Sequence, residues 1–190
     1  MDVFKAMKER RSVGKVKDTP VDRALIEQIL EAGIWAPNHH RTEPWQFFVM
    51  TGEGRRALGN AFADIAKELM DDPSTVENAG KLEQMEAKPF RAPVVIGVAA
   101  KPSQLERVVE IEELAAVHAA VQNMLLAAHA LGLGAIWRTG KRCYHKKVKD
   151  VFGLDDKGQM VGFLYIGYAD IDMKTPKKTA AKDKTTWIEK

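Results

Sequence analysis

Arg10, Arg11 and Ser12 place two guanidinium groups and a hydroxyl on three consecutive residues, directly after a short amphipathic segment. Guanidinium groups donate paired hydrogen bonds to oxyanions, so the triplet suits a ligand with several acceptor oxygens, a phosphate above all. Adjacent arginines are also common as solvated surface charge, so the triplet alone is weak evidence for a phosphate site. It gains weight from residues 35–39, Trp-Ala-Pro-Asn-His, and residues 137–140, Trp-Arg-Thr-Gly, if the fold joins the three stretches in one site.

Other kinds of site are poorly supported. His39 and His40 are adjacent on a polar loop and rarely would ligate one ion, while His118 and His129 are too far apart along one helix to share one, so we expect no metal site. No serine lies in a nucleophile elbow, and Cys143 lacks a local catalytic signature. Neither a Gly-x-Gly-x-x-Gly turn nor a Walker loop follows the first expected strand, so the usual dinucleotide-binding folds are unsupported.

Length and charge bound the class of protein. A chain of 190 residues fits one domain, residues 1–190, with a sizeable core. The net charge of +3 is too balanced to require a nucleic-acid partner. The single cysteine fits a reducing cytoplasm, and the amino terminus has no apolar run of a secretion signal, so we expect a cytoplasmic location.

The uncharged stretch from residue 114 to 137 has two interpretations. Its length would allow a membrane span, but it contains His118, Gln122, Asn123 and His129. A buried helix that runs into a strand explains it better. Because the helix is apolar nearly all round, we expect it to lie at the centre of the domain or in an oligomer interface.

The first half of the chain predicts helices around one strand. Asp2 can cap a short helix, and Thr19 can cap a second helix that ends before Pro37. Residues 45–50 read as a strand, and residues 58–69 carry the apolar stripe of a third helix. Residues 78–88 show poor periodicity and are our candidate for a mobile lid.

The second half predicts strands separated by helices. Residues 94–100 form a continuous apolar run, typical of a central strand buried on both faces. We expect a long helix over residues 105–131 stopped by Gly132, strands at 133–137 and 159–168, and a short helix at 144–152. This order predicts an α+β protein of three layers, in which helices cover both faces of a sheet of four or five strands.

The carboxyl-terminal residues 171–190 form a basic tail. Five lysines cluster in it: Lys174, Lys177, Lys178, Lys182 and Lys184. Two large apolar residues, Trp187 and Ile188, follow them and suggest docking on the chain's own body or on a partner chain.

Several motifs in order resemble those of the nitroreductase family of flavin enzymes. They are Arg-Arg-Ser near the amino terminus, a helix ending in Ala-Gly-x-x-Ala-Pro, and Pro-Trp-x-Phe-Phe-Val after it. The later Gly-Leu-Gly-Ala-Ile-Trp-Arg-Thr-Gly and Val-Gly-Phe-Leu-Tyr-Ile-Gly are similar to its short NAD(P)H nitroreductase subgroup. The similarity spans about residues 2–170 and implies a mostly antiparallel sheet.

The resemblance also implies an FMN-binding homodimer with two sites at the subunit interface. Arg10, Arg11 and Ser12 of one subunit would hold the phosphate and the ribityl chain. Trp35 and His39 would come from the other subunit. The stretch Trp137, Arg138 and Thr139 would join the phosphate-binding triplet around the same flavin.

The implied activity is an NAD(P)H-dependent reduction of nitro compounds, quinones or similar small acceptors, in which the flavin carries the chemistry and no side chain acts as nucleophile. Three positions depart from the family: Gly14 stands where a second basic residue is frequent, Glu43 replaces a glutamine, and Trp35 replaces an arginine. The roles of Lys15, Glu43 and the tail stay open, as do the natural acceptor and the choice between NADH and NADPH. Two alternatives remain: another flavin reaction on the same fold, such as reductive dehalogenation, and a non-catalytic flavin-binding protein.

Overall fold

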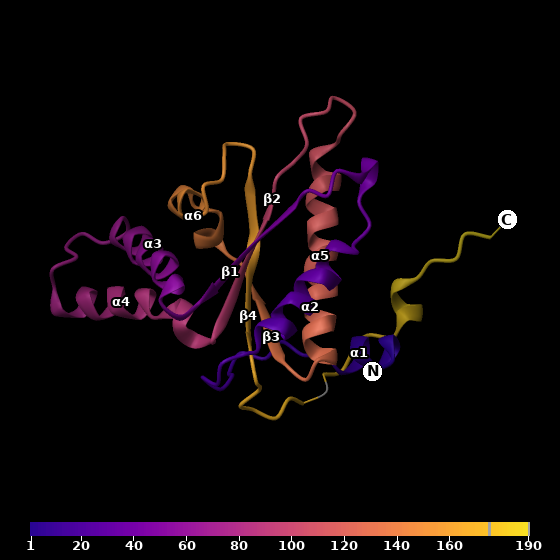
Figure 1. Cartoon of the computed structure of the whole chain (residues 1–190), viewed down its shortest axis with the longest axis horizontal. Coiled ribbons are helices and arrows are strands. Elements are labelled where there is room, and N and C mark those ends of the chain that lie inside the picture. Colours follow the sequence, from indigo (N-terminus) through magenta and orange to yellow (C-terminus); the bar gives the residue numbers. More distant parts are fainter. Residues whose placement is uncertain (175, 190) are drawn as a thin grey trace.

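The computed structural model describes residues 1–174 and 176–189 and places one antiparallel sheet between two layers of helices (Figure 1). The order across the sheet is β1 (Trp45–Thr51), β2 (Val94–Ala100), β4 (Gln159–Gly167) and β3 (Gly134–Arg138), and every pairing is antiparallel. The α+β class and the three layers are therefore confirmed, with four strands in the described part of the chain.

Strand β2 lies inside the sheet, as its continuous apolar run predicts. All seven of its residues are buried, because side chains alternate between the two faces of a strand and both faces are covered. Val94, Ile96 and Val98 join one core cluster, while Val95 and Ala99 join the other.

Two helices cover one face of the sheet and two cover the other. Helices α2 (Arg23–Ile34) and α5 (Glu110–Ala130) pack against the first cluster, whereas α3 (Arg56–Lys67) and α6 (Lys146–Val151) pack against the second. Helix α1 (Val3–Glu9) lies beside the carboxyl-terminal end of α5 (Figure 1). No helix in the described part of the chain is long and apolar enough to cross a membrane.

Two predicted helix caps and the predicted start of the long helix can be compared with the structure. Asp2 caps α1 as expected, since its carboxylate accepts from the backbone N–H groups of Phe4 and Lys5. The predicted Thr19 cap of α2 is wrong: the side chain of Asp22 accepts from the N–H of Ala24 at 2.9 Å, so the helix begins after it. The long helix begins at Glu110 and not at residue 105.

Residues 78–88, which showed poor periodicity, are helical over most of their length. Helix α4 (Val76–Glu86) has no buried residue, which explains why its sequence lacks a clear apolar stripe. It packs on α3 and not on the sheet, and Gly59 of α3 permits this contact because a Cβ there would collide with the carbonyl oxygen of Glu86. The lid role of this segment stays a prediction.

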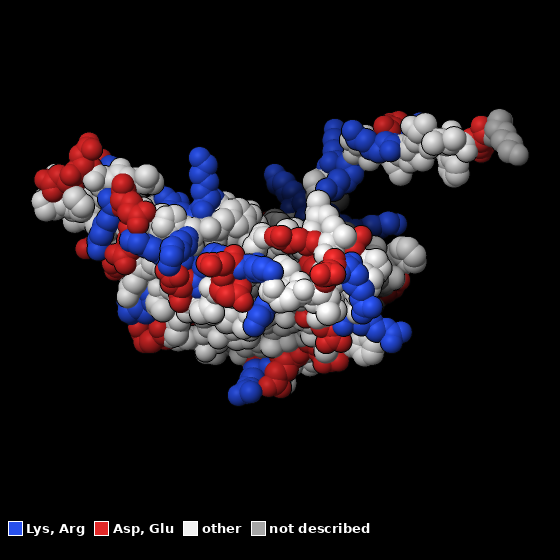
Figure 2. Space-filling view, turned by 90° about the horizontal axis from the view of Figure 1, so that it is seen from above, with Lys and Arg blue, Asp and Glu red and all other residues white. Residues whose placement is uncertain are grey.

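The tail leaves the body and extends away from it (Figure 1). Trp187 is 80% exposed and Ile188 is 96% exposed, so these side chains do not dock on their own chain. Seen from above, Lys and Arg are mixed with Asp and Glu over the body, and basic side chains gather where the tail projects (Figure 2). Docking of the tail on a partner subunit stays a prediction.

Candidate active site

Residues 10–13 run along the outer edge of the sheet beside β3. Ser12 forms a parallel bridge with Ala135, and the N–H of Val13 donates to the carbonyl of Ala135 at 2.9 Å. Gly134 permits this approach, because a Cβ there would overlap the side chain of Val13. The fold therefore brings the Arg-Arg-Ser triplet to the strand that carries Trp137 and Arg138.

The three residues of the triplet do different things. The Nη1 atom of Arg11 donates to the carbonyls of Lys8, at 2.6 Å, and Arg10, at 2.7 Å, so its guanidinium secures the turn after α1. All three residues, Arg10, Arg11 and Ser12, also line a surface pocket of about 630 Å³. Lys8 from α1 and Lys178 from the tail also line it, which makes this pocket cationic.

Trp137 and Arg138 point to opposite faces of the sheet, as adjacent strand residues must. The indole Nε1 of Trp137 donates to the carbonyl of Val161 at 3.3 Å, and its ring lies 5.6 Å from that of His118 on α5. Gly162 makes room for the indole, which would collide with any Cβ at that position. On the other face the Arg138 guanidinium lies 5.2 Å above the centre of the Tyr165 ring.

A cavity of about 370 Å³ opens at Arg138 and Thr139, on the face covered by α3 and α6. Its cationic lining residues are Lys88, Arg91, Arg138 and Arg142, and its apolar and aromatic ones are Phe62, Ile136, Trp137, Cys143, Phe163 and Tyr165. The Nε atoms of Arg138 and Arg142 are buried without a hydrogen-bond partner. Since buried donors are normally satisfied, the lining fits an anionic ligand.

Burial sets the ionisation of three cavity groups. It lowers the pKa of Lys88, and the positive charges of Arg142, Arg91 and Arg138 lower it further. It raises the pKa of Tyr165 to about 12 and that of the Cys143 thiol to about 12. A thiol with that pKa is protonated at neutral pH, so Cys143 is a packing residue and not a nucleophile.

His39 lies at the other end of α5 from the triplet, whereas Trp35 ends α2, whose Gly33 lies against Met124 in the second half of α5. The turn that holds His39 lies by the amino-terminal end of α5, and α1 lies by its carboxyl-terminal end (Figure 1). Helix α5 has 21 residues, so the turn that holds His39 and helix α1 lie about 30 Å apart along it. Trp35 is 77% exposed, and His39 Nδ1 lies 2.7 Å from Glu112 Oε2. One chain therefore does not bring His39 to the triplet, and it leaves Trp35 exposed.

The loop around His39 is strained and firmly anchored. His40, Arg41 and Glu43 have φ values of 60°, 54° and 48°, which are uncommon for residues other than glycine. The anchor is Glu113 of α5, only 1% exposed, whose carboxylate accepts from the Thr42 hydroxyl at 2.5 Å and the Ser103 N–H at 3.0 Å. Strain held by a buried charge is a frequent feature of ligand sites.

Glu113 is absent from the residues that the sequence singles out. The available signal was its position four residues before Val117, which places an acidic side chain in line with the buried stripe of α5. Among the described residues, no group of His, Cys, Asp and Glu could hold a metal ion.

FMN is an anionic, planar ligand, and the residues at the β3 edge suit such a group. Arg10 and Ser12 offer donors suited to a phosphate, and the buried Nε of Arg138 lacks a partner. Gly14 leaves open backbone beside Arg138, whose Nη2 lies 3.9 Å from the place that a Cβ would take. These donors and the open backbone lie along one sheet edge.

Comparisons with known proteins show the family of the chain. A model of the Nitroreductase family matches residues 7–168. The Bacillus subtilis protein named "Putative NAD(P)H nitroreductase YfhC" is 34% identical over 95% of this chain and 91% of its own. A nitroreductase-like family protein from Bacillus cereus superposes with a TM-score of 0.83 at 30% identity, over 100% of this chain and 97% of that one. A structure from Desulfovibrio desulfuricans, assigned as a nitroreductase in complex with FMN, has a TM-score of 0.68 at 27% identity and covers 96% of this chain and 94% of its own. The chain belongs to the nitroreductase family of flavin oxidoreductases.

Proposed function

We propose that this protein is an FMN-dependent oxidoreductase that takes hydride from NADH or NADPH and reduces nitro compounds, quinones or similar acceptors. The observation that carries the proposal is the pairing of Ser12 with Ala135. This pairing places the donors of the triplet on the edge of the strand that ends in Trp137, Arg138 and Thr139. The triplet would hold the phosphate of FMN, and Trp137, Arg138 and Thr139 would lie by its flat ring.

Each residue has a separate role in the proposed site. Arg10 and Ser12 bind the phosphate, and Arg11 supports them by holding the turn after α1 while keeping its Nη2 available. Arg138 and Thr139 meet the ring edge from β3, and Trp137 fixes the strand against Val161. Trp35 and His39 complete the site from a second subunit.

A homodimer is part of the proposal because one chain leaves both half-sites incomplete. Exposed apolar side chains lie near each half-site: Val3, Phe4 and Met7 are 52%, 68% and 54% exposed on α1, and Trp35 is 77% exposed. Between them, the outer side of α5 carries no charge after Glu113. Exposed apolar side chains of this kind are typical of an interface with another chain. Light scattering after gel filtration would give about twice the mass of one chain; a monomeric mass would refute the shared site.

FMN held by Arg10, Ser12, Arg138 and Thr139 would supply the two-electron chemistry that links the nicotinamide to the acceptor. For a nitro compound the balance is NAD(P)H + H⁺ + R–NO₂ → NAD(P)⁺ + R–NO + H₂O. The chain supplies orientation and positive charge: Arg138 stabilises negative charge that develops during reduction. Phe62 and Phe163 exclude water from one side of the cavity.

The first test is a visible absorption spectrum of the purified protein, repeated without oxygen after NADPH or NADH is added. We expect flavin bands that the nicotinamide bleaches. Bands that neither nucleotide bleaches would favour a binding role, and a colourless protein that ignores added FMN would refute the site.

A pair of variants tests the phosphate role. Arg10→Ala should lose FMN on dialysis while its circular dichroism stays that of the wild type. Lys5→Ala, an exposed basic residue on the same helix, should keep FMN. Stoichiometric FMN in Arg10→Ala would rule out the role of Arg10.

A further inference from the structure

The cavity beside Arg138 carries more positive charge than a flavin edge requires. Lys88 and Arg91 come from the turn before β2, and Arg142 comes from the turn after β3, so three cations reach the cavity from outside the residues assigned to FMN. We propose that Lys88, Arg91 and Arg142 form a subsite for the anionic substituent of an aromatic electron acceptor, such as the carboxylate of a nitrobenzoate. This inference rests on the proposed function and names the acceptor class.

The cations of this subsite lack counterions. Among the residues that the structure describes, neither Lys88, Arg91 nor Arg142 forms an ion pair, and no acidic side chain lines the cavity. The Nε of Arg142 is buried without a hydrogen-bond partner. An unsatisfied buried donor of this kind costs free energy that a bound oxyanion would recover.

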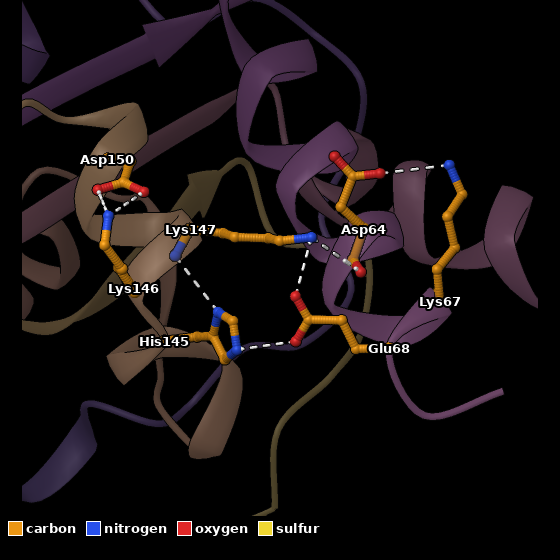
Figure 3. Close-up of polar contacts among 7 residues, drawn as sticks. All are labelled: Asp64, Lys67, Glu68, His145, Lys146, Lys147 and Asp150. Carbon is orange, nitrogen blue, oxygen red and sulfur yellow. Dashed lines mark hydrogen bonds and ion pairs between the residues drawn. The ribbon is translucent and has the colours of Figure 1, made fainter.

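The acidic side chains at the carboxyl-terminal end of α3, Asp64 and its C-cap Glu68, pair with other cations (Figure 3). Glu68 accepts from Lys147 Nζ at 2.9 Å and lies 3.2 Å from His145 Nε2, while Asp64 pairs with Lys67 at 3.2 Å. This network joins α3 to α6 and to the turn that carries Arg142. It therefore positions the Arg142 backbone and leaves its guanidinium uncompensated.

The rest of the lining selects the size and shape of the acceptor. Phe62 and Phe163 meet edge to face, with ring centres 5.9 Å apart, and form an apolar wall. A cavity of about 370 Å³ fits a molecule with one aromatic ring and not a whole dinucleotide. The combination of an apolar wall and unpaired cations favours a single-ring anion over the phosphates of NADPH.

The test compares 4-nitrobenzoate with 4-nitrobenzamide, which is neutral and similar in shape. The measured quantity is the ratio of kcat/KM for the anion to kcat/KM for the amide, because intrinsic differences in reactivity cancel when variants are compared. Arg142→Gln should lower this ratio about tenfold or more, the effect of losing one charge-assisted hydrogen bond. The neighbouring exposed cation gives the control, and Lys141→Gln should leave the ratio unchanged. If Arg142→Gln fails to fold, Lys88→Gln takes its place with the same expectation.

Two further measurements separate this subsite from the flavin and the nucleotide. FMN content should stay stoichiometric in Arg142→Gln; loss of FMN would show that the cation holds the cofactor and would overturn the proposal. An unchanged ratio, or a raised KM for NADPH with an unchanged ratio, would also overturn it.

Binding of benzoate, measured by calorimetry on the purified protein, gives a readout that needs no turnover. Its Kd should rise about tenfold in Arg142→Gln and with added salt. A protein that binds benzoate in this way but reduces nothing would refute the proposed function and keep the anion subsite. A protein that reduces 4-nitrobenzamide but does not bind benzoate would refute the anion subsite and keep the proposed function.

Discussion

Replacing Glu113 with alanine should destabilise the protein more than any other acidic substitution on α5. The carboxylate is 1% exposed and accepts from the Thr42 hydroxyl and the Ser103 N–H, so it joins two loops to the helix. Hydrogen bonds to a charged group contribute about 1.5–3 kcal/mol each, which gives about 3–6 kcal/mol for the pair. Thr42 and Ser103 are half-buried and regain water in the variant, so we expect the lower end, about 3 kcal/mol.

The assay is urea unfolding at a fixed protein concentration, with thermal unfolding beside it. For a chain of this length a loss of about 3 kcal/mol lowers Tm by about 6–12 °C. Glu112→Ala is the matched control: Glu112 is exposed and faces only His39, so its loss should cost less than about 1 kcal/mol.

A double-mutant cycle with Thr42→Val isolates one of the two hydrogen bonds. We expect a coupling energy of about 1.5 kcal/mol or more between Glu113 and Thr42. If Glu113→Ala were as mild as Glu112→Ala, or if the coupling were zero, the anchoring role of Glu113 would be refuted.

Three other predictions concern packing and ionisation. Gly59→Ala should cost about 1–3 kcal/mol because its Cβ meets the carbonyl of Glu86, whereas Gly80→Ala in α4, which meets nothing, should gain about 0.5–1 kcal/mol; thermal unfolding of the pair gives opposite signs if correct. Cys143, whose pKa burial raises to about 12, should react with iodoacetamide at pH 8 at least about a thousandfold more slowly in the native than in the unfolded protein, and fast native labelling would contradict its burial. Hydrogen bonding from Lys147 lowers the pKa of Glu68 below 4.5, so this stabilisation is complete above pH 4.5 and is lost as the pH falls through the lowered value. The Tm difference between wild type and Glu68→Gln should therefore vanish in acid, and a constant difference would refute the linkage.

The elements that the sequence predicted well are those whose signal is local. The run at residues 94–100 could only be a buried strand, and Asp2 caps the helix that it precedes. Helix α4 was harder to predict, because it packs on α3 through a helix backbone and buries no residue of its own. Its sequence therefore lacks the stripe on which periodicity depends.

The site was predicted in pieces, and the missing parts are those that depend on tertiary contacts. The spacing of residues could not show that Trp137 and Arg138 face opposite layers, or that Arg11 donates to carbonyls of its own turn. Lys88 and Arg142 are far apart in the sequence and meet only because the turns before β2 and after β3 lie beside one cavity. No motif marks either residue.

The geometry of Arg138 accounts for one departure from the family pattern. The frequent second basic residue after the serine is Gly14 here, and Arg138 Nη2 lies 3.9 Å from the place where a Cβ of residue 14 would lie. A long cationic side chain at position 14 would bring a second positive charge close to this guanidinium, which already lies in a cavity with Lys88, Arg91 and Arg142. Like charges at such a distance repel, so a glycine at position 14 is compatible with a crowded cationic cavity. In the proposed site, Arg138 would supply from β3 the positive charge that a basic residue at position 14 would otherwise bring, and Gly14 would leave the backbone open to the flavin.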